Sequence, residues 1–455
     1  MPLRRQSHTA VQARRADFWI YWTGQTVSHL GSSFTTFALP LLVYQLTGSA
    51  LNLGIATAAT FVPYLLFGLV IGAWVDRVNR KRLMILTDVL RSLAAAAIPV
   101  LAALGVLAVW QVYVLAFISS TLTIFFTSAE FAVIPSLVSS DDLVSANGRI
   151  QASYSGASVL GPLLAGLLLT LLPLSAVFLV DASSFVVSAI SILLIRVSFN
   201  LGAAGARRHI LREVGEGLRF VLRHPILRNI SFMMALVNLV SNVATAQLVL
   251  FASRQLHASN SQIAQLYAAG SIGVVVFSVL AGPLRRRFSF GVVALGALMI
   301  EGLLLEAFAY QTNFVIAAAL WGCGGMWTLL NINTGSLRQS ITPNHLLGRV
   351  MSISTVVAWS AIPIGAIAGG FAVQETGDVS FIFALVGAVT FVIPLAFFVF
   401  SPLGRVERYL AQHPSIRAEQ AEGALDVPLA EPVAVGALAP AAIMIESEVA
   451  DGVVS

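Results

Sequence analysis

Apolar runs of roughly twenty residues recur along most of the chain, and Gly, Pro and charged residues separate them. Each run is long enough to cross about 30 Å of hydrocarbon as a helix. Backbone inside a bilayer has to satisfy its hydrogen bonds within the segment, so helices are expected. The twelve runs span 17–46, 51–75, 83–104, 108–130, 143–172, 175–196, 229–253, 261–284, 289–310, 313–335, 347–373 and 379–401. The pattern predicts an all-α polytopic membrane protein with twelve transmembrane helices.

Composition supports this interpretation. The 455 residues are 57% hydrophobic and 10% charged, whereas soluble proteins carry about 25% charged residues. The single cysteine, Cys323, excludes an intramolecular disulfide. The N-terminus is basic, but the apolar run after Asp17 is too long for the core of a signal peptide. We therefore interpret this run as the first spanning helix.

The basic residues fall on one side of the predicted helices. They occupy the N-terminal tail, the 76–82 loop, Arg149, the 196–228 segment, Arg285 to Arg287, Arg338 with Arg349, and the C-terminal tail. Among the opposite loops, only Arg254 lies nearby. The positive-inside rule then places both termini in the cytoplasm, with the protein in the plasma membrane. The net charge of +5 reflects topology and contact with membrane lipids, so no nucleic-acid partner is expected.

The longest polar interruption, 197–228, separates two groups of six spans that echo each other. Gln45 and Gly72 precede Gln255 and Gly282 by 210 positions, as a tandem duplication leaves behind. Two pseudo-symmetric six-helix bundles are therefore expected. The predicted organisation is a cytoplasmic N-terminal tail (1–16), an N-terminal bundle (17–196), a cytoplasmic linker (197–228), a C-terminal bundle (229–402) and a disordered cytoplasmic tail (403–455).

Polar residues recur at helical spacing on one face of spans one, four, seven and ten. The resulting candidates for a substrate cavity are Gln25, His29, Ser32, Thr36, Thr123, Thr127, Asn238, Asn242, Thr328 and Asn331. Such residues can also simply hold helices together through hydrogen bonds. Matching stripes in both halves favour a hydrated central cavity, with aromatic residues such as Phe34, Phe37, Trp327 and Trp359 as apolar lining.

Between the second and third spans the chain reads Gly72-x-x-x-Asp76-Arg77-x-Asn79-Arg80-Lys81. This resembles the signature of the Major Facilitator Superfamily, with Asn79 in place of the usual glycine. Further segments are similar to bacterial drug-efflux carriers of the macrolide-efflux and enterobactin-exporter type. They are 24–50, "TDVLRS" (87–92), "FLVDASSF" (178–185) and "LLGRVMSIS" (346–354). The resemblance covers 17–402 and implies the major facilitator fold and drug:proton antiport.

The resemblance also implies a conformational latch between the halves that stabilises the outward-facing state. Its residues are Gly72, Asp76, Arg77, Arg80, Glu130, Gly348 and Arg349. Asp76 can meet the positive N-terminal end of span eleven near Gly348, while Arg80 is expected to reach Glu130. The alternative is that the basic loop residues only fix topology and bind anionic lipid headgroups.

Span five contains "GASVLGPLLAG" (156–166), which resembles the glycine-proline motif of exporters in this superfamily. The motif residues are Gly156, Gly161, Pro162 and Gly166, with Ala165 where a second glycine is common. Pro162 removes one helix hydrogen bond and creates a weak point. A kinked helix of another function would show the same features.

No nucleotide-binding motif is present, so ion coupling is the default energy source. The proton-coupling candidates are His29, which titrates near neutral pH, and Glu301, which lies at mid-depth in span nine. Either could instead have a structural role. Asp181 and the pair Asp88/Arg91 match family positions and are interpreted as packing and latch elements.

The sequence thus predicts a secondary transporter, acting as a monomer without cofactor or metal. It exports a small amphipathic compound, drug-like, macrolide-like or siderophore-like, by alternating access in exchange for protons. The alternatives are an importer of a small metabolite and a transport-inactive sensor or scaffold. An enzyme is not expected, because no catalytic constellation of carboxylates or histidines is present.

Overall fold

The computed structural model describes residues 2–75, 78–139, 142–197, 199 and 210–412, and these residues contain helices and no strands. The helices of the first half are α1 (Pro2–Thr47), α2 (Ala50–Val75), α3 (Arg80–Ala103), α4 (Val109–Leu137), α5 (Leu143–Leu168) and α6 (Leu174–Leu194). A linker helix, α7 (Ile210–Arg223), follows. The helices of the second half begin with α8 (Pro225–Arg254) and α9 (Asn260–Arg287).

The second half continues through segments in which regular α-helix alternates with short turns of other helical types. They are the π-helical turn η2 (Gly291–Leu295), α10 (Gly296–Ala309), α11 (Phe314–Cys323), the 3₁₀ turn η3 (Gly324–Met326), α12 (Trp327–Ile341), α13 (Asn344–Thr376), α14 (Val379–Phe400), η4 (Pro402–Arg405) and α15 (Val406–Gln412). Because η3 joins α11 directly to α12, these two helices form the single tenth span.

The predicted all-α polytopic fold class is confirmed, and the chain is a multi-pass membrane protein. Ten helical segments of the described residues are long and apolar enough to cross a membrane. The other two expected spans lie in α1 and α5, whose polar residues lower their mean hydropathy. As shown below, these two helices line an internal cavity, where a less apolar surface is tolerated.

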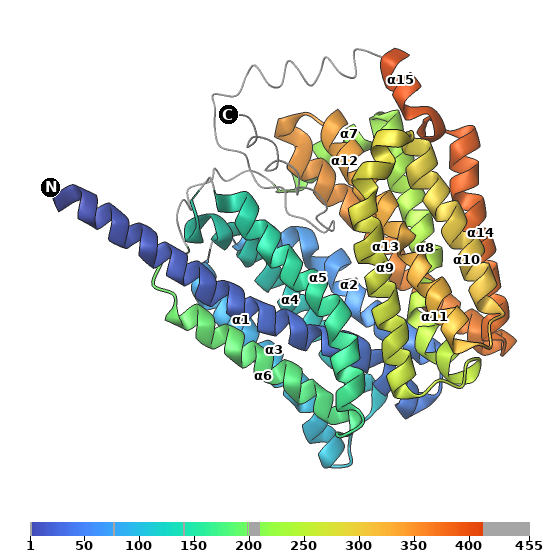
Figure 1. Cartoon of the computed structure of the whole chain (residues 1–455), viewed down its shortest axis with the longest axis horizontal. Coiled ribbons are helices and arrows are strands. Elements are labelled where there is room, and N and C mark those ends of the chain that lie inside the picture. Colours follow the sequence, from blue (N-terminus) through green and yellow to red (C-terminus); the bar gives the residue numbers. More distant parts are fainter. Residues whose placement is uncertain (1, 76–77, 140–141, 198, 200–209, 413–455) are drawn as a thin grey trace, which may run out of the picture.

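Helices α1–α6 pack mainly against one another, as do α8–α14, and the two groups lie side by side in Figure 1. Between the groups, α2 runs along α13 and α5 along α9. The predicted domain boundaries stay a prediction. Helix α1 begins at Pro2 within the predicted tail 1–16, α15 lies in the predicted tail 403–455, and residues 413–455 are outside the described part.

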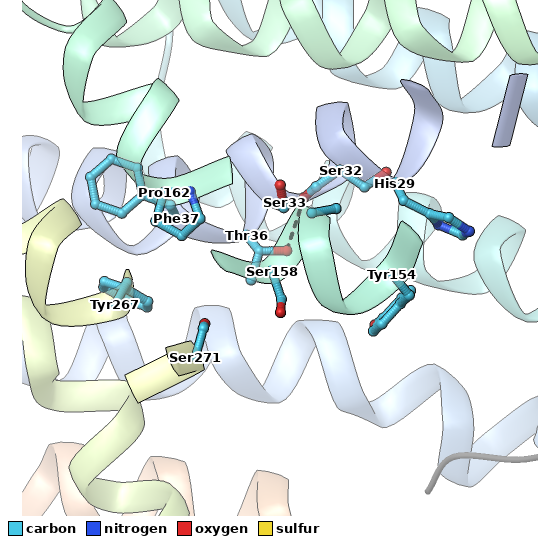
Figure 2. A pocket seen from close by; sticks show the side chains of 11 residues that line it. His29, Ser32, Ser33, Thr36, Phe37, Tyr154, Ser158, Pro162, Tyr267 and Ser271 are labelled. Atoms are coloured by element: carbon cyan, nitrogen blue, oxygen red, sulfur yellow. Dashed lines mark hydrogen bonds between the residues drawn. The ribbon is translucent and has the colours of Figure 1, made fainter. Parts of the chain in front are cut away.

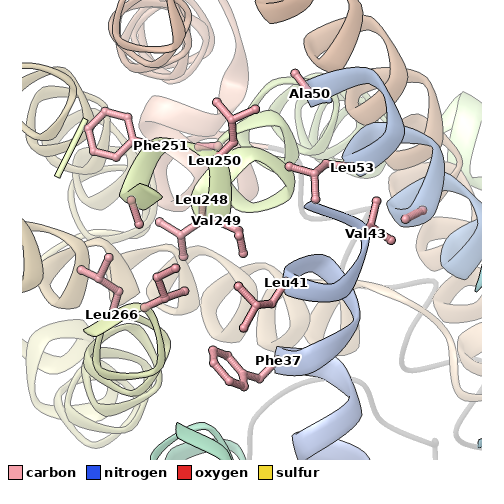
Figure 3. Close-up of a cluster of buried hydrophobic side chains, with 14 of the residues drawn as sticks. Phe37, Leu41, Val43, Ala50, Leu53, Leu248, Val249, Leu250, Phe251 and Leu266 are labelled. Atoms are coloured by element: carbon pink, nitrogen blue, oxygen red, sulfur yellow. The ribbon is translucent and has the colours of Figure 1, made fainter. Parts of the chain in front are cut away.

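One large apolar cluster, which we call the shared core, joins the two groups. Phe37, Leu41 and Leu53 of the first half lie in the same cluster as Leu248 and Phe251 of the second (Figure 3). Further contacts at the adjoining loops strengthen this connection. Gln247 Nε2 donates to the carbonyl oxygen of Ala50 at 2.9 Å, Arg254 donates to that of Gly48 at 2.9 Å, and Ser49 Oγ donates to Gln374 Oε1 at 3.1 Å. We call this the closed end.

Toward the other end, where α7 lies, each half has a core of its own. One core contains Tyr21, Met84 and Val133 of the first half. The other contains Ile226 and Val350 of the second half. We call this the linker end. The halves are thus joined by apolar packing at the closed end and packed separately at the linker end.

Candidate substrate cavity and its polar surroundings

A cavity of about 180 Å³ lies where α1, α5 and α9 meet, so both halves of the molecule form its wall. It is lined by His29, Ser32, Ser33, Thr36 and Phe37 of α1, Tyr154, Ala157, Ser158 and Pro162 of α5, and Tyr267 and Ser271 of α9 (Figure 2). Phe37 also belongs to the shared core, and its ring meets that of Tyr267 edge to face at 5.5 Å. This aromatic pair separates the cavity from the closed end.

Three of the four polar residues predicted from the stripe on α1 line this cavity: His29, Ser32 and Thr36. The Nε2 atom of His29 is buried without a hydrogen-bond partner. The imidazole ring lies 5.3 Å from the ring of Tyr154, in an edge-on arrangement. One ring nitrogen of this cavity-lining residue therefore has no hydrogen-bond partner in this conformation.

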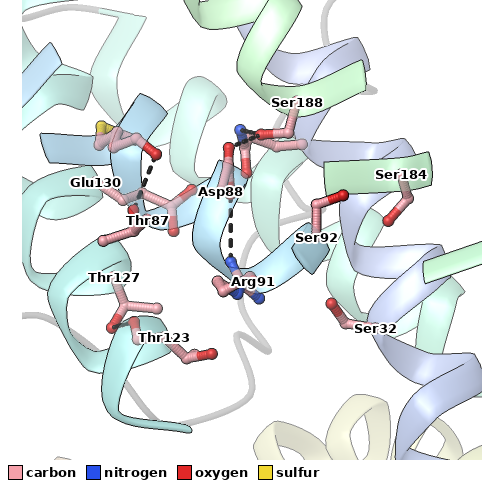
Figure 4. Close-up of polar contacts among 12 residues, drawn as sticks. Ser32, Thr87, Asp88, Arg91, Ser92, Thr123, Thr127, Glu130, Ser184 and Ser188 are labelled. Carbon is pink, nitrogen blue, oxygen red and sulfur yellow. Dashed lines mark hydrogen bonds and ion pairs between the residues drawn. The ribbon is translucent and has the colours of Figure 1, made fainter. Parts of the chain in front are cut away.

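The fourth residue of the stripe, Gln25, turns away from the cavity. Its Nε2 atom donates to Ser188 Oγ of α6 at 2.9 Å, and Gln25 is 2% exposed. The α4 candidates also lie elsewhere, beside Glu130 and Arg91 (Figure 4). Thr123 and Thr127 donate to backbone carbonyl oxygens one turn earlier, at 2.8 and 2.9 Å.

The polar residues predicted from stripes in the second half do not line this cavity. Asn238 Nδ2 donates to the carbonyl oxygen of Ala358 at 3.0 Å and thereby ties α8 to α13. Asn242 and Asn331 each donate to a carbonyl oxygen within their own helix. Thr328 is fully buried, and its hydroxyl has no partner. The second half instead contributes Tyr267 and Ser271 of α9, whose spacing of four residues is the signal that our sequence analysis missed.

A buried polar network lies behind the cavity within the first half. Asp88 Oδ2 accepts from Ser188 Oγ at 2.6 Å, and Asp88 Oδ1 lies 3.5 Å from a guanidinium nitrogen of Arg91 (Figure 4). Asp181 accepts from the hydroxyls of Ser32, Thr35 and Ser184. These contacts connect α1, α3 and α6.

Glu301 lies on α10, a helix that does not line the cavity. Its Oε2 atom is buried without a hydrogen-bond partner. The next residue, Gly302, packs against Gly387 and Phe391 of α14. Of the two proton-coupling candidates, only His29 therefore lies at the cavity.

A sequence model of the Major Facilitator Superfamily matches residues 21–360. The chain belongs to this superfamily. It is 28% identical over 371 residues to macrolide efflux protein A of Streptococcus pyogenes, covering 79% of this chain and 90% of that protein. It is 29% identical over 356 residues to the multidrug efflux pump Tap of Mycolicibacterium fortuitum, covering 75% of this chain and 85% of the pump.

The fold is similar to that of the nucleoside transporter NupG, with a TM-score of 0.69 at 11% sequence identity. The match covers 84% of this chain and 98% of NupG. At this identity the likeness concerns the fold alone. Superfamily membership confirms the predicted resemblance and makes the chain a membrane transporter of small molecules rather than an enzyme. The relatives favour drug efflux.

Much of the predicted latch lies outside the described residues. This applies to Asp76 and Arg77 and to the surroundings of Gly72 and Gly348. Arg80 donates to the carbonyl oxygen of Phe199 at 3.4 Å. Glu130 instead accepts from the hydroxyl of Tyr21 at 2.8 Å, so Arg80 and Glu130 have different partners here.

Arg349, a predicted latch residue of α13, contacts the linker helix. It donates to Glu216 of α7 at 2.9 Å. A Cβ atom on Gly217 would lie 2.6 Å from Ile353 Cδ1, which shows how closely α7 packs on α13. In this conformation the linker helix therefore occupies part of the surface of α13 that carries the latch sequence.

The exporter motif of the superfamily divides its residues between two neighbours of α5. A Cβ atom on Gly161 would overlap Ser33 of α1, and one on Gly166 would lie 2.5 Å from Ala264 Cβ of α9. Gly156 has open space beside it. Pro162 lines the cavity. The motif thus allows α5 to approach both halves closely, next to a cavity-lining proline that donates no backbone hydrogen bond.

Proposed function

We propose that this transporter exports a small amphipathic compound from a bacterial cytoplasm, in exchange for protons. The observation that carries the proposal is the cavity between α1, α5 and α9, because both halves form its wall and the shared core closes one side of it. A site placed in this way changes its accessibility whenever the halves rock against each other.

The arrangement of the apolar cores supports an inward-facing state, in which the linker end is the open end. The linker end carries most of the arginines, including the cluster Arg285 to Arg287, and the positive-inside rule makes it cytoplasmic. The first and second halves have separate cores at that end and one shared core at the other. A substrate therefore enters from the cytoplasm and leaves after the closed end has parted.

The chemistry of the cavity supports an amphipathic substrate. Its wall combines the rings of Phe37, Tyr154 and Tyr267 with several serine hydroxyls, and His29 is the one lining residue with an ionisable imidazole. The volume of about 180 Å³ lies below the 300–1,000 Å³ of typical drug sites. A macrolide-sized compound exceeds this volume, so its transport requires a state in which the two halves lie further apart. Macrolide-like and siderophore-like substrates both fit this description, and the efflux relatives favour the former.

His29 is the better of the two coupling candidates, because it lines the cavity and its buried Nε2 atom has no hydrogen-bond partner. A proton bound there and a substrate bound beside it occupy the same site, which is the simplest arrangement for exchange. Glu301, one helix away from the cavity, is the second candidate.

The test uses a drug-sensitive bacterial strain that expresses the chain, with ethidium and radiolabelled erythromycin as probes. Expression lowers the steady-state accumulation of at least one probe relative to an empty vector, and an uncoupler abolishes the difference. An importer raises accumulation, and a transport-inactive scaffold leaves it unchanged with or without the uncoupler. Unchanged accumulation of both probes counts against drug export.

A further inference from the structure

Four ionisable side chains of the first half lie buried close to one another. They are Asp88 and Arg91 of α3, Glu130 of α4 and Asp181 of α6, and each is less than 9% exposed. The guanidinium of Arg91 lies 3.5 Å from Asp88 and within electrostatic range of Asp181 and Glu130. Figure 4 shows Arg91 below Asp88, on the side that faces α4. We call these four residues the charge cluster.

The charge cluster contains three acids and one cation. Buried charges in a membrane protein persist where opposite charges pair. One guanidinium balances one carboxylate, so the cluster stays balanced only when protons accompany the remaining acids. A cluster of this composition is therefore suited to binding and releasing protons.

Aromatic rings hold Arg91 in place independently of its acidic partners. Its guanidinium lies 4.0 Å from the centre of the Phe185 ring and 5.5 Å from that of Phe126. Cation–π contacts of this kind stabilise a buried guanidinium. Arg91 can therefore remain beside Asp88 and within electrostatic range of Asp181 while the protonation of either acid changes.

Helix α1 connects the charge cluster to the substrate cavity. Ser32 lines the cavity, and its Oγ atom donates to Asp181 Oδ1 at 3.3 Å. Two turns earlier on the same helix, Gln25 donates to Ser188 Oγ, which in turn donates to Asp88. The same helix thus contacts the cavity and, directly or through one serine, both acids.

The other ionisable groups around the cluster are accounted for. The hydroxyl of Tyr21 on α1 donates to Glu130 at 2.8 Å, which makes Glu130 the acid with a dedicated tyrosine partner. His29 of α1 and Tyr64 of α2 both lie within electrostatic range of Arg91, and Tyr154 of α5 lies within range of Glu130. His29 is therefore placed to respond to the charge of the cluster as well as to the cavity.

We propose that Asp88 and Asp181, which share Arg91, form the proton-carrying site of the transporter. Each carboxylate takes up a proton on an oxygen and releases it unchanged, so no other bond forms or breaks. A proton on Asp181 Oδ1 converts the acceptor of Ser32 into a donor, and one on Oδ2 does the same to the acceptor of Thr35. Either change rearranges a hydroxyl of α1 near the cavity wall. The inference rests on the proposed exporter function and moves its coupling site from His29 to the charge cluster.

The test compares D88N and D181N with D378N in proteoliposomes, and radiolabelled erythromycin is the transported probe. Asp378 is exposed and caps α14 through its Oδ1 atom, a bond that asparagine can also make. Counterflow between equal pH values measures binding and rocking without protons, and accumulation driven by a pH gradient measures coupling. D378N is expected to match the wild type in both.

The two cluster variants keep counterflow within about twofold and lose gradient-driven accumulation by about tenfold or more. If the wild type shows no counterflow of erythromycin, the proposed export of this compound fails. If the wild type accumulates erythromycin and both cluster variants accumulate it equally well, the proton-carrying site is overturned while export stands.

A variant that keeps all three acids tests the proposal even if D88N or D181N does not fold. Ser188→Ala removes the hydroxyl that donates to Asp88 and leaves all four cluster residues in place. Because an ionised carboxylate loses a donor, the pH midpoint of gradient-driven accumulation moves upward in S188A relative to the wild type. An unchanged midpoint contradicts the role of Asp88.

Discussion

The contact between α2 and α13 at the closed end offers a direct test of alternating access. A Cβ atom on Gly54 of α2 would overlap the carbonyl oxygen of Ala366 and lie 3.2 Å from Ile367 Cα, both of α13. These are backbone atoms of a packed helix, so they cannot turn aside as a side chain can. Gly54→Ala is therefore expected to force the closed end apart.

The size of the effect follows from the overlap. Overpacking of this kind costs about 1–3 kcal/mol, and a bias of 1–3 kcal/mol shifts an equilibrium between two states by about 5- to 150-fold. The cost applies only while α2 and α13 touch. G54A therefore favours the state in which the closed end has opened, by roughly one order of magnitude.

Gly68→Ala on the same helix is the matched control. A Cβ atom on Gly68 has nothing within 4 Å, yet both substitutions bring the same gain of about 1 kcal/mol in helix propensity. The difference between the two variants thus isolates the contact with α13.

The assay measures exposure of the closed end. Ser49, which bonds Gln374 across the two halves, is replaced by cysteine in a C323A background and labelled with a membrane-impermeant maleimide. Labelling of S49C is expected to be about tenfold faster with G54A than with G68A. Equal labelling rates in two well-folded variants would refute the argument that this contact closes the transporter.

Three further changes test local features of the structure. Tyr267→Ala removes the ring that closes the cavity beside Phe37, and the affinity for ethidium, measured by fluorescence titration, falls by about 0.5–1.5 kcal/mol. Burial lowers the pKa of His224, whose Nδ1 atom caps α8, so its stabilising contribution is full above about pH 6.5 and falls below it. The thermal unfolding temperature of the wild type in detergent therefore falls as the pH is lowered from 7.5 to 5.5, and His224→Ala makes it less dependent on pH. Burial raises the pKa of Glu407, but the Phe290 N–H and Arg285 outweigh it and leave the pKa below its ordinary value. The Arg285–Glu407 ion pair is about half exposed. Glu407→Gln therefore lowers the free energy of unfolding, measured by denaturant titration, by less than about 1 kcal/mol.

Sequence reasoning predicted the helices well because the bilayer imposes a strong rule on every span. A segment in hydrocarbon has to be apolar, long and helical, and each of these properties is visible in the residues themselves. The two expected spans in α1 and α5 are less apolar than the other ten, and this also follows a physical rule. Both line the cavity, so part of each surface contacts polar space rather than lipid.

Sequence reasoning was less successful in locating the cavity wall. The spacing of Asn238 and Asn242 shows that they share a face of α8, but it does not reveal what that face contacts. In this conformation Asn238 bonds Ala358 of α13. Tyr267 of α9 was missed for the same reason. An aromatic residue in a spanning helix can contact lipid, pack in the core or line a cavity, and the sequence alone does not distinguish these roles.

The charge cluster shows the same limit in a stronger form. Asp88 and Arg91 are three residues apart, so their pairing on α3 is visible in the sequence. Asp181 is far away along the chain, and its closeness to Arg91 depends on how α3 and α6 pack. A cluster of three acids around one cation therefore becomes visible only in three dimensions.

Helix α1 is the element through which proton and substrate can influence each other. Near its middle Ser32 lines the cavity and bonds Asp181, while Gln25, two turns earlier, bonds the serine that contacts Asp88. Toward its end Leu41 belongs to the shared core that closes the molecule. A rigid helix transmits a displacement along its whole length, so a hydrogen bond lost at Asp181 acts on the cavity and on the closed end together. The proposed coupling of proton and substrate then requires no relay of moving parts between distant sites, because one helix contacts the cavity, the charge cluster and the shared core.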